Sequence, residues 1–151
     1  MKVAVGFDHR GVTLRKAVLA AVKSAGCTAV DCGVENGDKR VDYPDVASAV
    51  GMAIRSGRAE RGILVCGSGV GASIAASKMP GIRAAICHDS FSAHQGVEHD
   101  DMNVLCLGSG IVGDSVVPEL VRAFLSARFV AEGRYLTRLK KVERLEKMVD
   151  G

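Results

Sequence analysis

The sequence predicts an α/β protein: a Rossmann-like three-layer sandwich with a five-stranded parallel sheet, helices on both faces and an extra C-terminal helix. Five short apolar runs alternate with longer amphipathic segments. The apolar runs are rich in β-branched residues and nearly continuous in hydrophobicity, as strands buried on both faces are. Right-handed crossovers between such strands lead to a Rossmann-like or flavodoxin-like arrangement.

The expected elements follow one another in regular βα order. The strands are predicted at residues 2–7, 28–32, 62–66, 83–87 and 103–107. The helices between and after them are predicted at 10–25, 44–57, 70–79, 90–97 and 114–128. The first helix has apolar residues close to a 3.6-residue period and ends at Gly26, and Pro44 suits the start of the second.

The chain from about 132 to 150 is predicted as a sixth helix with no strand after it. Apolar residues recur at every third position from Leu136 to Met148, while Arg134 and Arg138 share another face. A helix outside the βα series often packs on a partner subunit, and a solvated charged face is the alternative.

Length and composition narrow the function classes. The 151 residues suit a single domain over 1–151, and 48% hydrophobic residues allow a core. The 20 basic and 17 acidic residues leave a net charge of +3, too small to suggest a nucleic-acid partner. No apolar run is long enough for a membrane span, and no signal peptide precedes the first strand. Five cysteines without metal-type spacing indicate a cytoplasmic protein with neither disulfides nor a zinc site.

Polar residues gather in the turns after the predicted strands, where parallel sheets bind ligands. The turn at 6–11 has the glycine spacing of a P-loop, but Val12-Thr13 stands where Lys-Ser/Thr is required. The turn at 108–113 matches a dinucleotide pattern, yet it follows the last strand and is better explained as a tight turn.

The turn at 66–71 is the strongest candidate site. Glycines at 67, 69 and 71 let successive N–H groups converge at a helix start, forming a nest for a phosphate or a developing oxyanion. Cys66 precedes this nest and is predicted to be a reactive thiol, whereas the other four cysteines are predicted to be core residues. Spacing alone leaves a Cys–His hydrolase open. It also leaves His9, His99 and Tyr43 open as ligands or as ordinary loop and packing residues.

Taken in order along the whole chain, these motifs resemble ribose-5-phosphate isomerase type B, a family that also holds the galactose-6-phosphate isomerase subunits. The motifs that carry the resemblance are Gly6-x-Asp8-His9-x-Gly11, Asp42-Tyr43-Pro44, the run 66–71, Ile74-Ala75-Ala76 with Lys78, the run 81–84, Ser92-Ala93, His99, the run 103–105 and Glu132-Gly133-Arg134 with Arg138.

The resemblance implies interconversion of an aldose phosphate and a ketose phosphate without metal or cofactor. Cys66 would move a proton between C2 and C1 of the open-chain sugar, since Ala72 stands where some members carry a glutamate base. His99 would open the furanose ring. The enediolate would be stabilised by Ser68 and the amides of Gly67, Gly69, Val70 and Gly71. Sugar hydroxyls would be held by Asp8 and Tyr43, and the phosphate by His9, Arg134 and Arg138.

The family also implies a homodimer, or a dimer of dimers, with each site formed between two subunits. Two positions depart from its pattern: Asp100 replaces a usual asparagine in the substrate site, and Gly110 replaces a phosphate-binding arginine. The resemblance makes ribose 5-phosphate the preferred substrate. The two departures keep a related four- to six-carbon sugar phosphate (galactose 6-phosphate or allose 6-phosphate type) as the alternative. A non-catalytic phosphosugar-binding module and a nucleotide-binding flavodoxin-like domain are the remaining hypotheses.

Overall fold

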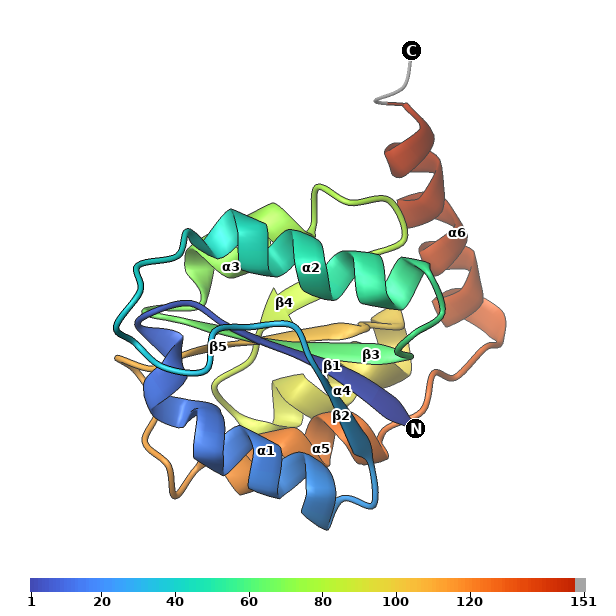
Figure 1. The fold of residues 1–151 in the computed structure, drawn as a ribbon. Coiled ribbons are helices and arrows are strands. Elements are labelled where there is room, and N and C mark those ends of the chain that lie inside the picture. Colours follow the sequence, from blue (N-terminus) through green and yellow to red (C-terminus); the bar gives the residue numbers. More distant parts are fainter. Residues whose placement is uncertain (149–151) are drawn as a thin grey trace.

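The computed structural model describes residues 1–148 and confirms the predicted fold class. Five parallel strands form one sheet in the order β2-β1-β3-β5-β4 (Figure 1). They are β1 (Lys2–Phe7), β2 (Thr28–Asp31), β3 (Arg61–Cys66), β4 (Ala84–Ile86) and β5 (Val104–Gly108). The helices are a 3₁₀ turn η1 (Gly11–Leu14), α1 (Arg15–Ser24), α2 (Tyr43–Arg55), α3 (Val70–Ala76), α4 (Ser90–Asp100), α5 (Val117–Ser126) and α6 (Gly133–Lys147).

The strand order brings the carboxyl ends of β1, β3 and β5 together. β3 lies at the centre, with β1 on one side and β5 on the other, while the short β4 forms an edge. In the register, Phe7 pairs with Val65 and Cys66 pairs with Gly108. The turns that follow β1, β3 and β5 are therefore neighbours at one end of the sheet, where ligands of parallel sheets bind.

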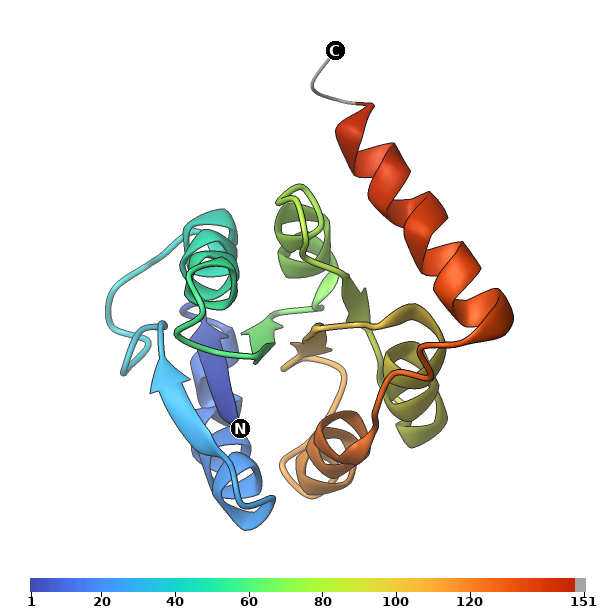
Figure 2. The same ribbon diagram turned by 90° about the vertical axis from the view of Figure 1, so that its right-hand side faces the viewer.

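Two hydrophobic cores lie on opposite faces of the sheet. Alternate residues of β3 enter different cores, because successive side chains of a strand point to opposite faces. Ile63 and Val65 pack with helices α1, α4 and α5, whereas Leu64 and Cys66 pack with α2 and α3. Figure 2 shows these two helical layers above and below the sheet, with α6 extending away from them.

The helix predicted at 90–97 is longer than expected, which moves two candidate residues. α4 continues to Asp100, so His99 and Asp100 lie on its last turn rather than in a polar loop. Asp101 ends the helix in the left-handed conformation, with φ of 50°. Arg83 supports this turn through an ion pair with Asp101 at 2.7 Å.

The C-terminal helix is the element least covered by the rest of the chain. α6 ends at Lys147, and the predicted helical residues 149–150 lie outside the described part. Of its apolar stripe, Leu139 is buried, while Val142, Leu145 and Met148 are exposed. No helix within residues 1–148 has the length and apolar character needed to cross a membrane.

Candidate active site

The thiol of Cys66 lies at the carboxyl end of the central strand β3. It is buried, and the backbone N–H of Gly69 donates a hydrogen bond to its Sγ at 3.1 Å. Gly69 adopts φ of 82°, a conformation that side chains rarely tolerate, and this turn points the amide back at the sulfur. A donor aimed at sulfur stabilises a thiolate more than a thiol, so the geometry suits a base or nucleophile.

Three other cysteines have environments that disfavour the thiolate. Burial raises the pKa of Cys87 to about 11, with a further contribution from Asp89. Burial is also the main cause of the raised pKa of Cys106 and of Cys32. Cys87 and Cys106 are buried and fit the predicted core role, whereas Cys27 and Cys32 are only half-buried at the margins of the cores.

Two more glycines of the turn allow close approach by other parts of the site. The ring of Tyr43 lies over Gly71, where an added Cβ would stand 2.7 Å from Cζ of the tyrosine. Gly67 is covered in the same way by the guanidinium of Arg10. Ser68 is exposed, and its Oγ accepts the N–H of Val70 at 3.3 Å. The turn thus presents a hydroxyl and a tyrosine beside the thiol.

The turn after β1 is held by its own side chains. Oδ1 of the buried Asp8 accepts the N–H groups of Arg10 and Gly11 at 2.9 and 2.7 Å. His9 makes a 3.0 Å hydrogen bond between its Nδ1 and the carbonyl of Val41. The N–H of Val41 also lies 3.4 Å from Nδ1, and in the tautomer in which Nδ1 accepts this N–H, Nε2 carries the proton and can donate to an anion.

The turn after β5 closes over the turn after β3. The N–H of Ser109 donates to Cys66 O at 2.8 Å, and the N–H of Gly110 donates to Gly67 O at 2.9 Å. The N–H of Gly108 donates to Nε2 of His88 at 2.9 Å, which requires an unprotonated nitrogen. Burial lowers the pKa of His88, although nearby Asp89 opposes the shift. A neutral His88 therefore supports the end of β5.

A second cluster contains the other predicted residues. The imidazole of His99 stacks on the ring of Tyr135, and Arg134 donates to the Tyr135 hydroxyl at 3.0 Å. Arg138 follows one turn later on α6 and is exposed. α4 ends just before β5 begins, and Asn103 O accepts the N–H of Gly62 at the start of β3. The His99 cluster therefore lies at the amino end of the sheet, opposite Cys66.

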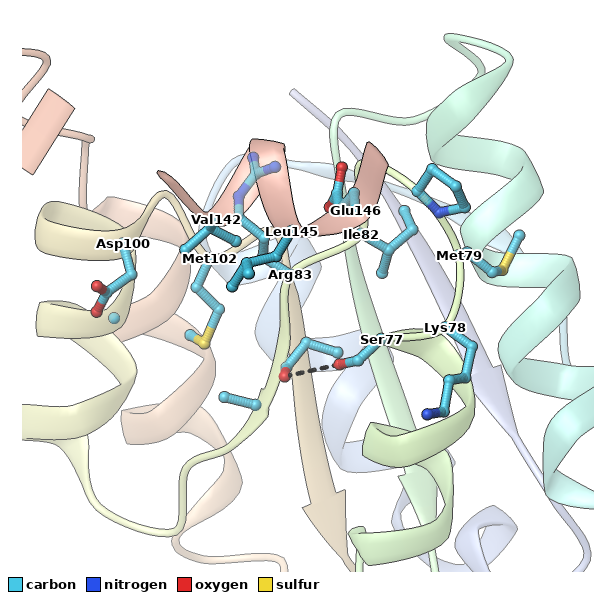
Figure 3. A pocket seen from close by; sticks show the side chains of 14 residues that line it. Ser77, Lys78, Met79, Ile82, Arg83, Asp100, Met102, Val142, Leu145 and Glu146 are labelled. Atoms are coloured by element: carbon cyan, nitrogen blue, oxygen red, sulfur yellow. Dashed lines mark hydrogen bonds between the residues drawn. The ribbon is translucent and has the colours of Figure 1, made fainter. Parts of the chain in front are cut away.

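A pocket separate from the thiol lies against α6 (Figure 3). Its volume is about 660 Å³. Val142 and Leu145 of α6 line it together with Ile82 and Arg83 from the turn before β4. Asp100 also lines this pocket, whereas no residue of the 66–71 turn does. The structure does not place Asp100 near Cys66 within one chain.

Local sequence patterns assign no role to three residues that lie in or beside the predicted site. Tyr135 stacks on His99, Arg10 covers Gly67, and His88 holds the backbone beside the thiol. Arg10 and Tyr135 directly follow the predicted residues His9 and Arg134 in the sequence. That adjacency is the sequence signal that could have identified them. His88 had a weaker one, as a histidine in a turn after a strand.

Comparison with known proteins links this arrangement to one family. Residues 3–142 match the model of the family described as Ribose/Galactose Isomerase. The chain is 39% identical over 145 residues to ribose-5-phosphate isomerase B of Escherichia coli, covering 96% of each chain. It is 35% identical over 133 residues to D-erythrulose-4-phosphate isomerase of Pectobacterium atrosepticum, covering 88% of each. The structure of Clostridium thermocellum ribose-5-phosphate isomerase B superposes with a TM-score of 0.93 at 41% identity, covering 99% of both chains.

Proposed function

The chain belongs to the Ribose/Galactose Isomerase family, and on this premise we propose that its aldose–ketose isomerase activity interconverts ribose 5-phosphate and ribulose 5-phosphate. The reaction passes through an enediolate and uses Cys66 as the base. The observation that carries the mechanism is the 3.1 Å hydrogen bond from the Gly69 N–H to the Cys66 Sγ. No other cysteine of the described chain has a backbone N–H donor aimed at its sulfur among the hydrogen bonds found.

The proton transfer follows from this position of the thiolate. Cys66 removes the proton from C2 of the open-chain aldose, and the electron pair forms the C1–C2 double bond while negative charge develops on O1. Return of the proton to C1, with transfer of the O2 proton to O1, completes the ketose. Ser68 and the amides of the 67–71 turn stabilise the enediolate, because preorganised donors favour charge as it develops.

We propose that each complete site combines residues of two copies of the chain. His99, Arg134 and Arg138 lie at the opposite end of the sheet from Cys66, so one chain does not bring them to the thiol. The exposed apolar residues Val142 and Leu145 of α6 support a second copy as the covering partner. In the dimer, His99 opens the sugar ring and the two arginines bind the phosphate of the sugar whose C1 and C2 lie at the partner's thiol.

The remaining substrate contacts lie in the turns around Cys66. Tyr43 and Asp8 hold sugar hydroxyls, with Oδ2 of Asp8 available because both of its hydrogen bonds found in residues 1–148 use Oδ1. His9 contributes Nε2 to the phosphate. We also propose a cytoplasmic location, which the five unpaired cysteines favour.

A second candidate substrate is a four-carbon sugar phosphate. The relative from Pectobacterium atrosepticum, at 35% identity, is a D-erythrulose-4-phosphate isomerase. A four-carbon aldose with phosphate on O4 cannot close a furanose ring, so it needs no ring-opening acid. His99→Ala would then lose activity on ribose 5-phosphate while retaining it on erythrose 4-phosphate.

The test is a coupled isomerisation assay on four-, five- and six-carbon aldose phosphates with purified wild-type protein, Cys66→Ala and Cys106→Ala. Wild type is expected to turn over ribose 5-phosphate fastest, and Cys66→Ala is expected to lose turnover while still binding inorganic phosphate. Cys106→Ala is the matched control from the neighbouring strand and should stay active. An active Cys66→Ala protein would exclude the thiol as the base.

A further inference from the structure

The guanidinium of Arg10 lies flat against the backbone of Gly67, directly after the Cys66 position. A Cβ built on Gly67 would stand 2.6 Å from Cζ and 2.7 Å from Nη1 of Arg10. Only glycine leaves room for this contact, because a methyl group there would overlap the guanidinium. The arginine therefore occupies a defined place at the carboxyl end of β3, although it is exposed.

Hydrogen bonds to main-chain groups join the turns after β1, β3 and β5 around this arginine. Ser109 Oγ donates to the carbonyl of Arg10 at 2.9 Å, and Gly110 N–H donates to the carbonyl of Gly67 at 2.9 Å. Asp8 holds the N–H of Arg10 from the other side. The backbone from which the side chain extends is thus fixed, and replacing the side chain removes none of these bonds.

The charge of Arg10 has no counterion in the described chain. The ion pairs within residues 1–148 use Arg15, Arg83 and His94, and no carboxylate lies within 4.0 Å of the Arg10 guanidinium. Asp8 is close in sequence, but its Oδ1 is engaged by backbone amides. An unpaired guanidinium at the ligand-binding end of the sheet favours an anionic ligand.

The guanidinium lies at the residue that follows the thiol in the chain. Cys66 faces the core formed with α2 and α3, as Leu64 does, whereas Val65 faces the core formed with α1 and α5. Gly67 lies in the bend after the strand, and the Arg10 guanidinium covers the position of its Cβ. The same turn therefore offers a thiol for the reacting carbons and a cationic group for an anion.

We propose that Arg10 binds the phosphate group of the substrate together with His9, and so sets the affinity for phosphorylated sugars. This inference rests on the proposed function for the identity of the substrate. Arginine presents several N–H donors in a planar fork that matches phosphate oxygens. Because the phosphate keeps its charge throughout the reaction, the contact is equally strong in ground and transition states and acts on KM rather than on kcat.

The test compares Arg10→Ala and Arg10→Lys with wild type and with Arg122→Ala, an exposed arginine on α5. Initial rates on ribose 5-phosphate give kcat and KM, and inorganic phosphate is used as a competitive inhibitor. Arg10→Ala is expected to raise KM and the phosphate inhibition constant together by about tenfold or more, since hydrogen bonds to charged groups have that worth. The KM and phosphate inhibition constant of Arg10→Lys should lie between those of wild type and Arg10→Ala. Both constants of Arg122→Ala should match those of wild type.

A second variant tests the contact with Gly67. Gly67→Ala should displace the guanidinium and raise KM. The KM of the double variant Gly67→Ala/Arg10→Ala should be no higher than that of the more affected single variant. Additive effects, or an Arg10→Ala protein with unchanged KM and phosphate inhibition, would overturn the proposal. If the wild type isomerised no sugar phosphate while calorimetry showed Arg10-dependent phosphate binding, the proposed reaction would fail and the Arg10 assignment would stand.

Discussion

The imidazole of His99 lies against the phenol ring of Tyr135, with 4.3 Å between ring centroids and 20° between ring planes. The contact joins the last turn of α4 to the first turn of α6 and so places His99 beside Arg134. A stacked neighbour limits the rotamers of a histidine. A ring-opening acid needs such a fixed orientation in order to reach the ring oxygen of the sugar. In the proposed mechanism, Tyr135 is therefore the residue that positions His99.

Replacement of Tyr135 should separate positioning from stability. Tyr135→Phe keeps the stacked ring and is expected to keep kcat near wild type. Tyr135→Ala is expected to lower kcat on ribose 5-phosphate by about tenfold, because small misplacements of catalytic groups have effects of that size or larger. Steady-state kinetics check this, with thermal unfolding as a control. Equal kcat values for the two variants would contradict a positioning role.

The contact between Gly71 and Tyr43 predicts a split between activity and stability. In Gly71→Ala, the new Cβ would stand 2.7 Å from the tyrosine Cζ, so the ring must move. Because Gly71 lies in α3 and alanine is the better helix former, the free energy of unfolding should stay equal or rise by up to about 1 kcal/mol. KM is expected to rise, as we also expect for Tyr43→Phe. Urea unfolding and initial rates measure the two effects, and unchanged KM in Gly71→Ala would count against the Tyr43 contact.

His88 predicts a pH dependence of stability. Burial lowers its pKa in the folded protein below the ordinary value of 6.5, so at pH below 6.5 the unfolded chain takes up a proton that the folded chain does not. The free energy of unfolding is therefore expected to fall as the pH decreases from 6.5 toward the lowered pKa. From about one unit above pH 6.5 both states are neutral at this residue, and no contribution to the slope remains.

His88→Gln supplies the control for that slope. The glutamine side chain offers an amide oxygen to the Gly108 N–H but does not titrate. Urea unfolding measured between pH 5.5 and pH 7.5, a window of about one unit on either side of the ordinary histidine pKa, should show a flatter pH dependence for the variant. The same slope in both proteins would mean that another group is responsible.

Arg61 predicts a stability effect away from the site. Its Nη2 donates to Ala127 O at 2.7 Å, its Nη1 donates to Phe124 O, and the guanidinium covers the Phe124 ring at 5.4 Å. Arg61→Met removes donors from carbonyls at the end of α5 and should lower the free energy of unfolding by about 1–3 kcal/mol. Arg122→Met, on the exposed face of α5, is the control. Equal urea midpoints for Arg61→Met and wild type would show that the hydrogen bonds from Arg61 to the end of α5 contribute nothing measurable to stability.

The local sequence pattern is sufficient to predict the strands, the glycine-rich turn at 67–71 and the position of Cys66 before it. Buried parallel strands have continuous apolar runs, and the alternating glycines at 67, 69 and 71 directly follow one of them. Each glycine has a structural reason: Arg10 covers the first, the second has positive φ, and Tyr43 covers the third. The positions of the strand, the glycines and Cys66 depend on residues close together in the chain, whereas the side chains that cover Gly67 and Gly71 come from distant segments.

Other features depend on tertiary contacts that no local pattern contains. The polar run from Glu98 to Asp101 suggested a loop, yet Val97 packs into the core and Asp101 closes the helix with Arg83, so His99 lies on α4. The strand order, with β5 between β3 and β4, decides which turns meet. The path of the Arg10 side chain across to Gly67 follows only from that order.

The central claim is that Cys66 of one copy and His99 of another act on the same sugar phosphate. The most direct measurement mixes inactive Cys66→Ala and His99→Ala proteins, unfolds and refolds them together, and assays ribose 5-phosphate isomerisation. Random pairing in a symmetric dimer makes about half of the dimers mixed, each with one intact site, so activity should recover to about one quarter of wild type. Mixtures that stay as inactive as the separate variants would contradict a shared site.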